Sequence, residues 1–181
     1  MPPTPRVLAM QALQQFTKNP DAVWKSTFQE SWIIQVFEAE KDMLVVARTG
    51  GGKSLAYLLP PMEETLDLLK QQNIPAVLIN SCQDLDVPPF NTRVIVVTVE
   101  AAAQIAFYTF AHNLGIKRFI IDEAHQYIDD QSYRTYMAGV ARLRSIAGQF
   151  VFTTGSLSPS QQGQLLQKIF NLVQVQVFRE S

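Results

Sequence analysis

The chain has 181 residues, of which 47% are hydrophobic and 17% charged, and its 15 basic and 16 acidic residues leave a net charge of −1. This length and apolar content suffice for one domain with a single buried core, and they exclude the disordered and fibrous classes of protein. Because charged residues fall below the usual ~25% and form no acidic or basic block, composition gives no electrostatic reason to expect a long nucleic-acid track or an anionic membrane as a partner. The composition does not exclude a small binding face for such a partner.

Targeting and redox signals are few. Cys82 is the single cysteine, so no disulfide forms within the chain, and we interpret it as a small buried hydrophobe in a reducing compartment. The amino terminus has no apolar stretch behind a basic start, and no run approaches the ~20 apolar residues that span a bilayer. We therefore expect an intracellular protein with no membrane partner.

Short β-branched runs alternate with helical patterns, which predicts βα units around a mostly parallel sheet. In chain order we predict a helix over Arg6–Phe16, a helix over Phe28–Ala39, a strand over Met43–Ala47, helices over Lys53–Leu59 and Met62–Gln71, strands over Ala76–Ile79 and Arg93–Thr98, a helix over Ala101–Asn113 ended by Gly115, a strand over Arg118–Asp122, a helix over Ser132–Ile146, a strand over Gln149–Thr153, a helix over Ser160–Asn171 and a strand over Val173–Phe178. All strands but the last carry three or more consecutive aliphatic or aromatic residues, so we expect helices on both faces of the sheet. The last strand alternates polar and apolar residues, which suits either an edge strand or a segment that leaves the domain.

The strongest chemical signal is the stretch Ala47–Ser54, which follows a predicted strand and opens a predicted helix. It reads ARTGGGKS, with alanine where the strict phosphate-loop pattern has its first glycine. Glycines let the backbone aim successive amides at phosphate oxygens, and the helix amino terminus adds about half a positive charge. Lys53 can reach the β- and γ-phosphates and Ser54 can ligate Mg²⁺. The alternative is a glycine-rich turn without a ligand.

A second signal is Asp122-Glu123-Ala124-His125 at the end of an apolar strand. Such a strand end places Asp122 where it can hold the Mg²⁺ of a bound nucleotide, with Glu123 able to orient or deprotonate an attacking water. Alone, an acidic pair is more often a helix amino-terminal charge, and His125 a surface or capping residue. The pairing with the phosphate loop makes this motif specific.

A third signal is the hydroxyl-rich end of the strand over Gln149–Thr153, which continues as Thr154-Gly155-Ser156-Leu157. Ser158 and Pro159 follow it and look like a helix start, with a side-chain cap and proline at the first helical position. Two interpretations of this turn stay open: helix capping alone, or a coupling role in the chemistry of the phosphate loop.

Together these residues resemble the first RecA-like domain of a superfamily 2 DExH-box helicase, of the RecQ-like (DEAH-box) group, from about Trp24 to Ser181. The resemblance implies an α/β P-loop NTPase fold, a RecA-like mostly parallel sheet flanked by helices on both faces, with ATP and Mg²⁺ as cofactors. It assigns adenine contact to Gln29, triphosphate binding to Thr49, Gly50, Gly51, Gly52, Lys53 and Ser54, metal binding to Ser54 and Asp122, catalysis to Lys53, Asp122, Glu123 and His125, and nucleic-acid contact or coupling to Thr98, Glu100, Thr154 and Ser156.

Domain organisation follows from the same resemblance. We predict a partly flexible helical extension over 1–23, the ATP-binding domain over 24–178 and the start of a linker over 179–181. A second RecA-like domain, in cis or in trans, is implied as a partner, because it carries the arginine finger that accelerates phosphoryl transfer by ~10³–10⁵ in related enzymes. The family's extra strand and nucleic-acid-gripping turn have no counterpart at Pro60-Pro61, and there is no room after the acidic motif for the aromatic-rich loop of RecQ enzymes.

The leading hypothesis is the ATP-binding half of a nuclear DNA helicase with 3′–5′ polarity, as the resemblance implies, incomplete alone. We expect it to bind DNA rather than RNA, and weakly, given the net charge of −1. The alternative is a degenerate, non-enzymatic helicase fragment that keeps the fold and nucleotide binding only. An unrelated P-loop ATPase is disfavoured because Gln29, the acidic motif and the hydroxyl motif come in helicase order.

Overall fold

The structure is a computed structural model. It describes residues 3–38, 41–48, 75–86, 88, 92, 94–129, 135–146, 148–171 and 174–180. The helices predicted over Lys53–Leu59 and Met62–Gln71 lie outside the described residues, as do Thr49 to Ser54 of the predicted phosphate loop.

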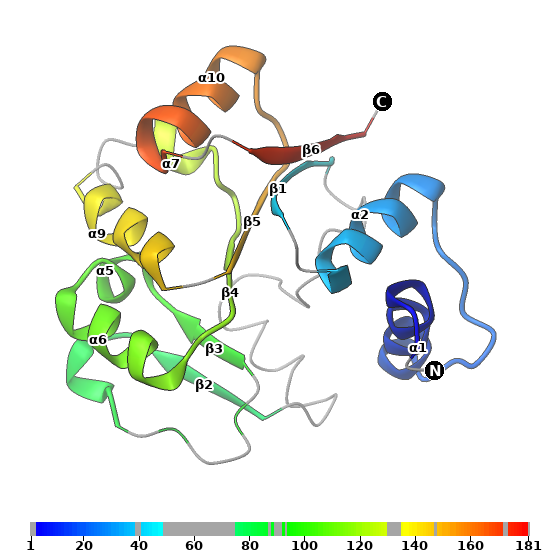
Figure 1. The fold of residues 1–181 in the computed structure, drawn as a ribbon, viewed down its shortest axis with the longest axis horizontal. Coiled ribbons are helices and arrows are strands. Elements are labelled where there is room, and N and C mark those ends of the chain that lie inside the picture. The colour runs from blue at the N-terminus through cyan, green and yellow to red at the C-terminus, as the bar shows by residue number, and fades with distance from the viewer. Residues whose placement is uncertain are drawn as a thin grey trace.

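Parallel strands form the centre of the molecule (Figure 1). Four of them pair in the order β4-β5-β1-β6, namely β4 (Arg118–Ile121), β5 (Gln149–Thr154), β1 (Asp42–Val46) and β6 (Val175–Arg179). A second sheet pairs β2 (Ala76–Ile79) with β3 (Val94–Val97), also in parallel. The prediction of a mostly parallel sheet is confirmed, although the described strands form two sheets instead of one.

The register aligns the carboxyl ends of the strands. In β1, Val46 lies opposite Thr154 of β5 on one side and Arg179 of β6 on the other. The last residues of three strands therefore stand side by side at one edge of the sheet. Among the described strands β6 is an edge strand of this sheet, one of the two positions that its alternating sequence suits.

Helices cover both faces of the four-stranded sheet (Figure 1), as the consecutive apolar residues of its strands predict. On one face lie α1 (Pro5–Thr17) and α2 (Thr27–Glu38), whose Trp32 packs with Met43 and Val45 of β1. Leu44 and Val46 of the same strand point to the other face. That face is covered by α5 (Val99–Ala102), α6 (Ile105–Leu114), α7 (Gln126–Asp129), α9 (Met137–Arg142) and the helical segment that starts with α10 (Pro159–Gly163).

Several helices differ from the predicted ones. The helix predicted over Ala101–Asn113 is two helices, because the backbone at Gln104 is extended (φ −80°, ψ 149°). The helix predicted over Ser132–Ile146 is observed as α9, followed by a 3₁₀ turn over Leu143–Ser145, and α7 precedes it. The helix predicted over Ser160–Asn171 begins as α10 and continues as a π-helical turn over Gln164–Ile169.

Two predicted helix ends are confirmed. Gly115 ends α6 in the left-handed conformation (φ 62°), the backbone conformation in which glycine is favoured. Ser158 caps α10 in a capping box with Gln161, and Pro159 takes the first helical position. The turn after β5 therefore caps α10, and the coupling role that was the other interpretation of this turn stays a prediction.

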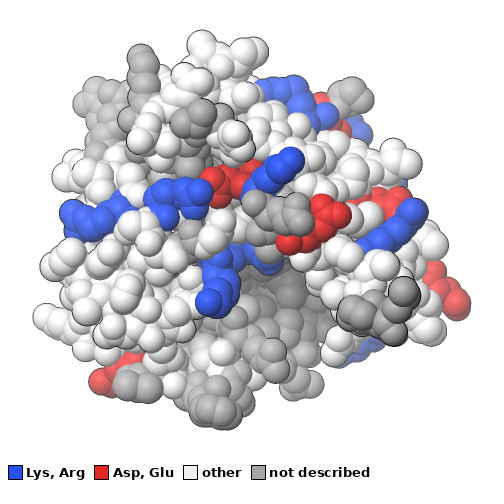
Figure 2. Space-filling model, viewed as in Figure 1, with Lys and Arg blue, Asp and Glu red and all other residues white. Residues whose placement is uncertain are grey.

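Charged side chains at the amino ends of the strands are paired rather than free. The carboxylate of Asp42, which is 6% exposed, accepts the Phe150 amide at 2.8 Å and pairs with Arg144 at 2.9 Å. Arg118 donates to the side chain of the buried Gln149 at 2.5 Å, and burial lowers the pKa of Arg118 below its ordinary value. On the face shown in Figure 2, basic and acidic side chains of the described residues are interspersed.

Candidate functional site

The acidic motif begins where β4 ends. Asp122 directly follows the strand, and its Oδ1 accepts a hydrogen bond from the hydroxyl of Thr153 at 2.5 Å and another from the amide of Glu123 at 2.9 Å. Thr153 is fully buried in β5. The position of Asp122 is thus fixed from the neighbouring strand, a contact that the sequence analysis did not predict.

Glu123 has an unusual backbone. Its φ is 45°, in the left-handed region that costs an ordinary residue about 1–2 kcal/mol. The turn is held by its hydrogen bond to Asp122 and by the amide of Ala124, which donates to the carbonyl of Thr153 at 3.0 Å. Backbone strain held in place by surrounding contacts is typical of functional sites.

His125 joins the acidic motif to the hydroxyl turn. Its Nδ1 lies 3.2 Å from a carboxylate oxygen of Glu123 and 3.0 Å from the hydroxyl of Thr154. Thr154 in turn donates its hydroxyl proton to the carbonyl of Ser156 at 3.0 Å. Because that proton is committed, the Thr154 oxygen acts as acceptor and His125 carries its proton on Nδ1. A continuous chain of polar contacts therefore runs from Glu123 to Ser156.

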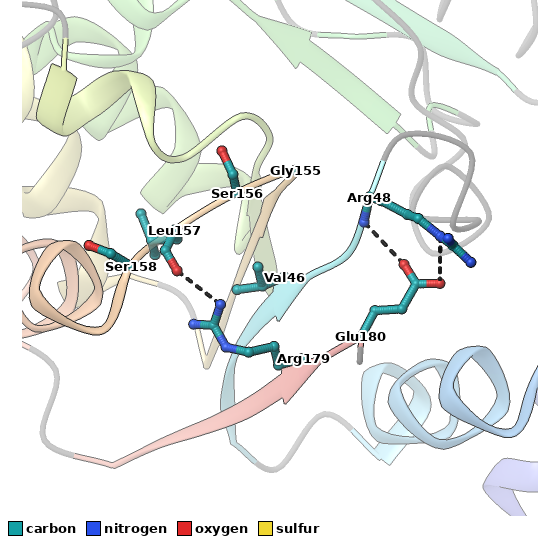
Figure 3. A pocket seen from close by; sticks show the side chains of 8 residues that line it. All are labelled: Val46, Arg48, Gly155, Ser156, Leu157, Ser158, Arg179 and Glu180. Atoms are coloured by element: carbon teal, nitrogen blue, oxygen red, sulfur yellow. Dashed lines mark hydrogen bonds and ion pairs between the residues drawn. The ribbon is translucent and has the colours of Figure 1, made fainter.

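Beside the hydroxyl turn, the three aligned strand ends line a pocket of about 490 Å³. It is lined by Val46, Arg48, Gly155, Ser156, Leu157, Ser158, Arg179 and Glu180 (Figure 3). Arg48 and Glu180 form an ion pair at its rim (3.4 Å), and Arg179 donates to the carbonyl of Leu157 at 2.9 Å. Arg179 and Glu180, predicted as the start of a linker, instead contact this site, because two parallel neighbouring strands must end at the same edge.

Gln29 lies apart from the acidic motif, on α2 over the other face of the sheet. It is fully buried; its side-chain oxygen accepts the amide of Lys25 at 2.9 Å, and its Nε2 has no hydrogen-bond partner. A buried amide donor without a partner is costly to leave unpaired. The assignment of Gln29 to adenine stays a prediction.

Thr98 and Glu100 lie at the end of β3, in the two-stranded sheet. The hydroxyl of Thr98 caps α5 by accepting the amide of Ala101 at 3.3 Å, and it lies 3.3 Å from the carbonyl of Asn80 at the end of β2. Glu100 is exposed in the first turn of α5. The structure therefore brings together Asp122, Glu123, His125, Thr154 and Ser156, and it places Thr98 and Glu100 at a separate strand end.

The donors at the carboxyl edge suit magnesium. Mg²⁺ takes one or two protein carboxylates together with phosphate and water oxygens, rather than a cage of protein ligands. Asp122 offers such a carboxylate, and within the described residues no group of three or more histidines, cysteines or acidic residues could hold a metal. Asp122 could hold the ion through this carboxylate, and its assignment to the metal together with Ser54 of the undescribed loop stays a prediction.

Sequence comparisons point to helicases. Residues 26–86 match the model of the DEAD/DEAH box helicase family. The ATP-dependent rRNA helicase SPB4 of Chaetomium globosum is 34% identical over 80 residues, 42% of this chain and 12% of that protein. The ATP-dependent DNA helicase Q5 of Rattus norvegicus is 26% identical over 172 residues, 77% of this chain and 18% of that protein. The chain thus spans less than a fifth of the length of these relatives.

Solved structures share the fold. A hypothetical ATP-dependent RNA helicase from Sulfolobus tokodaii matches 92% of this chain and 56% of its own, with a TM-score of 0.64 and 13% identity. A Dbp5 variant of S. cerevisiae matches 95% of this chain and 50% of its own, with a TM-score of 0.63 and 18% identity. Within the described residues, no helix has the length and apolar character needed to cross a membrane. The match over residues 26–86 is thus to the DEAD/DEAH box helicases, and the fold is that of a RecA-like helicase domain.

Proposed function

We propose that this chain is the ATP-binding domain of a nucleic-acid helicase, an ATPase whose turnover responds to a bound strand. The observation that carries the proposal is the chain of contacts from Glu123 through His125 to Thr154, which joins the ends of β4 and β5. In an ATPase whose turnover depends on a bound strand, the residue that positions the attacking water must be coupled to the part of the site that changes when the strand binds. This contact chain offers a path for such a response.

The roles divide as follows in this proposal. Lys53 and the glycines of the phosphate loop bind the triphosphate, and Gln29 contacts adenine. Asp122, fixed by Thr153, holds Mg²⁺, which neutralises charge on the phosphates. Glu123 orients the attacking water and accepts its proton, while His125 sets the direction of the Glu123 carboxylate.

We propose DNA as the strand, with RNA as the competing candidate. Support for DNA comes from the Q5 relative, whose similarity runs over 77% of the chain. Support for RNA comes from the SPB4 relatives, which reach higher identity over shorter stretches. In either case we expect weak binding, because basic and acidic side chains of the described residues are interspersed on the face in Figure 2 and the net charge is −1.

The deciding measurement is ATP hydrolysis by the 181-residue chain with and without single-stranded DNA or RNA of the same sequence. We expect slow hydrolysis that DNA stimulates more than RNA and that Glu123→Gln abolishes. The matched control is Glu38→Gln, which changes an exposed carboxylate at the end of α2. Stimulation by RNA alone would reverse the assignment of the strand.

The competing hypothesis is a non-enzymatic fragment, and it makes a different prediction. A fluorescent ATP analogue with Mg²⁺ would then bind to the wild type, Lys53→Ala would weaken that binding, and neither strand would elicit turnover. A folded wild-type chain that binds no ATP analogue would refute both hypotheses.

A further inference from the structure

The two last described residues of the chain make contacts that the proposed roles do not use. One carboxylate oxygen of Glu180 accepts the backbone amide of Arg48 at 3.1 Å, and the other pairs with the Arg48 guanidinium Nε at 3.4 Å (Figure 3). Glu180 is itself held, because its amide donates to the carbonyl of Val46 at 2.9 Å. The Glu180 carboxylate thus grips the chain where it leaves β1.

The contact between Glu180 and Arg48 lies next to the residues predicted to bind phosphate. Arg48 is the second residue of the predicted phosphate-loop stretch Ala47–Ser54. Next to Glu180, Arg179 ties the same end of β6 to the hydroxyl turn by donating to the carbonyl of Leu157. The end of β6 is therefore bonded to both segments that flank the proposed nucleotide site.

We infer that Glu180 is a positioning residue for nucleotide binding, acting through the backbone amide of Arg48. This inference rests on the proposed function. A phosphate loop binds phosphates through backbone amides, so the place where the chain leaves β1 matters for binding. The contact to the Arg48 amide fixes that place before the nucleotide arrives, which reduces the conformational entropy lost on binding.

The two halves of the Glu180 contact are unequal. The Arg48 side chain is 82% exposed, so its ion pair is screened by solvent and contributes little. The Glu180 side chain is only 20% exposed, and its hydrogen bond to the Arg48 amide is charge-assisted. The backbone contact, rather than the ion pair, should therefore carry the effect.

Three variants separate these contributions in a titration of the full chain with a fluorescent ATP analogue and Mg²⁺. Glu180→Ala removes both contacts and should raise Kd about tenfold, the change that corresponds to 1.4 kcal/mol. Glu180→Gln keeps an oxygen that can accept the amide but loses the charge, so its Kd should rise less. Arg48→Ala keeps the backbone contact and should stay within about twofold of wild type. Asp21→Asn, an exposed carboxylate between α1 and α2, serves as the matched control.

The inference is supported if the increase in Kd is largest for Glu180→Ala, smaller for Glu180→Gln and smallest for Arg48→Ala. An unchanged Kd in both Glu180 variants overturns it, and so does an Arg48→Ala effect as large as that of Glu180→Ala, because the arginine charge would then be the relevant group. If Glu180→Ala does not fold, the Kd values of Glu180→Gln and Arg48→Ala are compared: a larger increase for Glu180→Gln supports the inference, and an equal or smaller one overturns it.

Amide hydrogen exchange in the nucleotide-free chain separates this inference from the proposed function. Exchange at the Arg48 amide should accelerate in Glu180→Ala, while exchange in the core of β5 stays the same. If wild type binds no nucleotide, the proposed function fails. Unchanged exchange at Arg48 refutes the positioning role regardless of binding.

Discussion

Gly139 offers the sharpest test of how the helices on the site's side of the sheet are packed. A Cβ added at Gly139 in α9 would lie 2.1 Å from the carbonyl oxygen of Ala103 and 2.6 Å from its Cα. These are backbone atoms, which cannot rotate away, and real Cβ atoms essentially never come within 3.0 Å of a neighbour. Gly139→Ala must therefore push α9 and the end of α5 apart by roughly 1 Å.

The expected magnitude follows from two opposing contributions. Overpacking of this kind costs about 1–3 kcal/mol, and a contact with fixed backbone belongs at the upper end. Alanine in place of glycine inside a helix returns about 1 kcal/mol. We expect a net loss of about 2 kcal/mol in the free energy of unfolding, and a fall in Tm of roughly 4–8 °C for a chain of this size.

The same substitution at two other glycines provides the controls. At Gly163, whose backbone is helical (φ −60°, ψ −39°), an added Cβ meets nothing within 4 Å, so Gly163→Ala should stabilise the fold by up to ~1 kcal/mol. At Gly115 the space is equally open but φ is +62°, so Gly115→Ala should cost about 1–2 kcal/mol through the backbone alone. Urea unfolding followed by circular dichroism measures all three. A wild-type midpoint for Gly139→Ala, or an equal loss for Gly163→Ala, would refute the packing argument.

Three further predictions concern hydrogen bonds. Thr154→Val keeps the shape of a buried side chain but removes the hydroxyl that accepts a hydrogen bond from His125. We expect kcat for ATP hydrolysis to fall about tenfold, the equivalent of one hydrogen bond of about 1.4 kcal/mol, while Kd for the ATP analogue stays unchanged. A kcat equal to that of wild type would exclude the coupling path. Asp42→Asn removes the buried charge that pairs with Arg144 and should lower the free energy of unfolding by about 1–3 kcal/mol in urea, whereas an unchanged midpoint would mean that the pair is neutral for stability. Ser158→Ala removes the side-chain cap of α10 and should cost about 1 kcal/mol in the same assay, less in Ser158→Asp, which can still cap.

Most strands could be predicted because they are short, apolar and bounded by polar residues. The strand over Ala76–Ile79 has the predicted bounds, and the strand that starts at Gln149 extends one residue further, to Thr154. The helix break at Gln104 could not be predicted, because alanine-rich sequence on both sides of it favours a continuous helix. Tertiary packing outweighs that preference: α9 approaches the Ala103 carbonyl at Gly139, a contact between residues far apart in sequence.

In the candidate site, too, the sequence predicts which segments meet but not which atoms form the contacts. The order of motifs is sufficient to predict that the acidic motif and the hydroxyl turn meet, since both follow strands of one parallel sheet. It is not sufficient to predict the atoms that meet: that Thr153 binds Asp122, or that His125 lies between Glu123 and Thr154. Those contacts depend on which side chain of each turn faces its neighbour, and the left-handed backbone of Glu123 decides this for the acidic motif.

The missed contact of Glu180 obeys a rule that the sequence does contain. Glu180 and Arg48 are 132 residues apart, yet each follows one of two strands that pair in parallel, β6 and β1. Residues that directly follow paired parallel strands leave the sheet at the same edge, a few ångströms apart. The predicted linker over 179–181 does not include this proximity, because a linker would not pair with β1, whereas Arg179 is the last residue of β6. Once β6 is known to extend to Arg179, the next residue must lie beside Ala47 and Arg48, and an acid there faces the amide and the charge of Arg48.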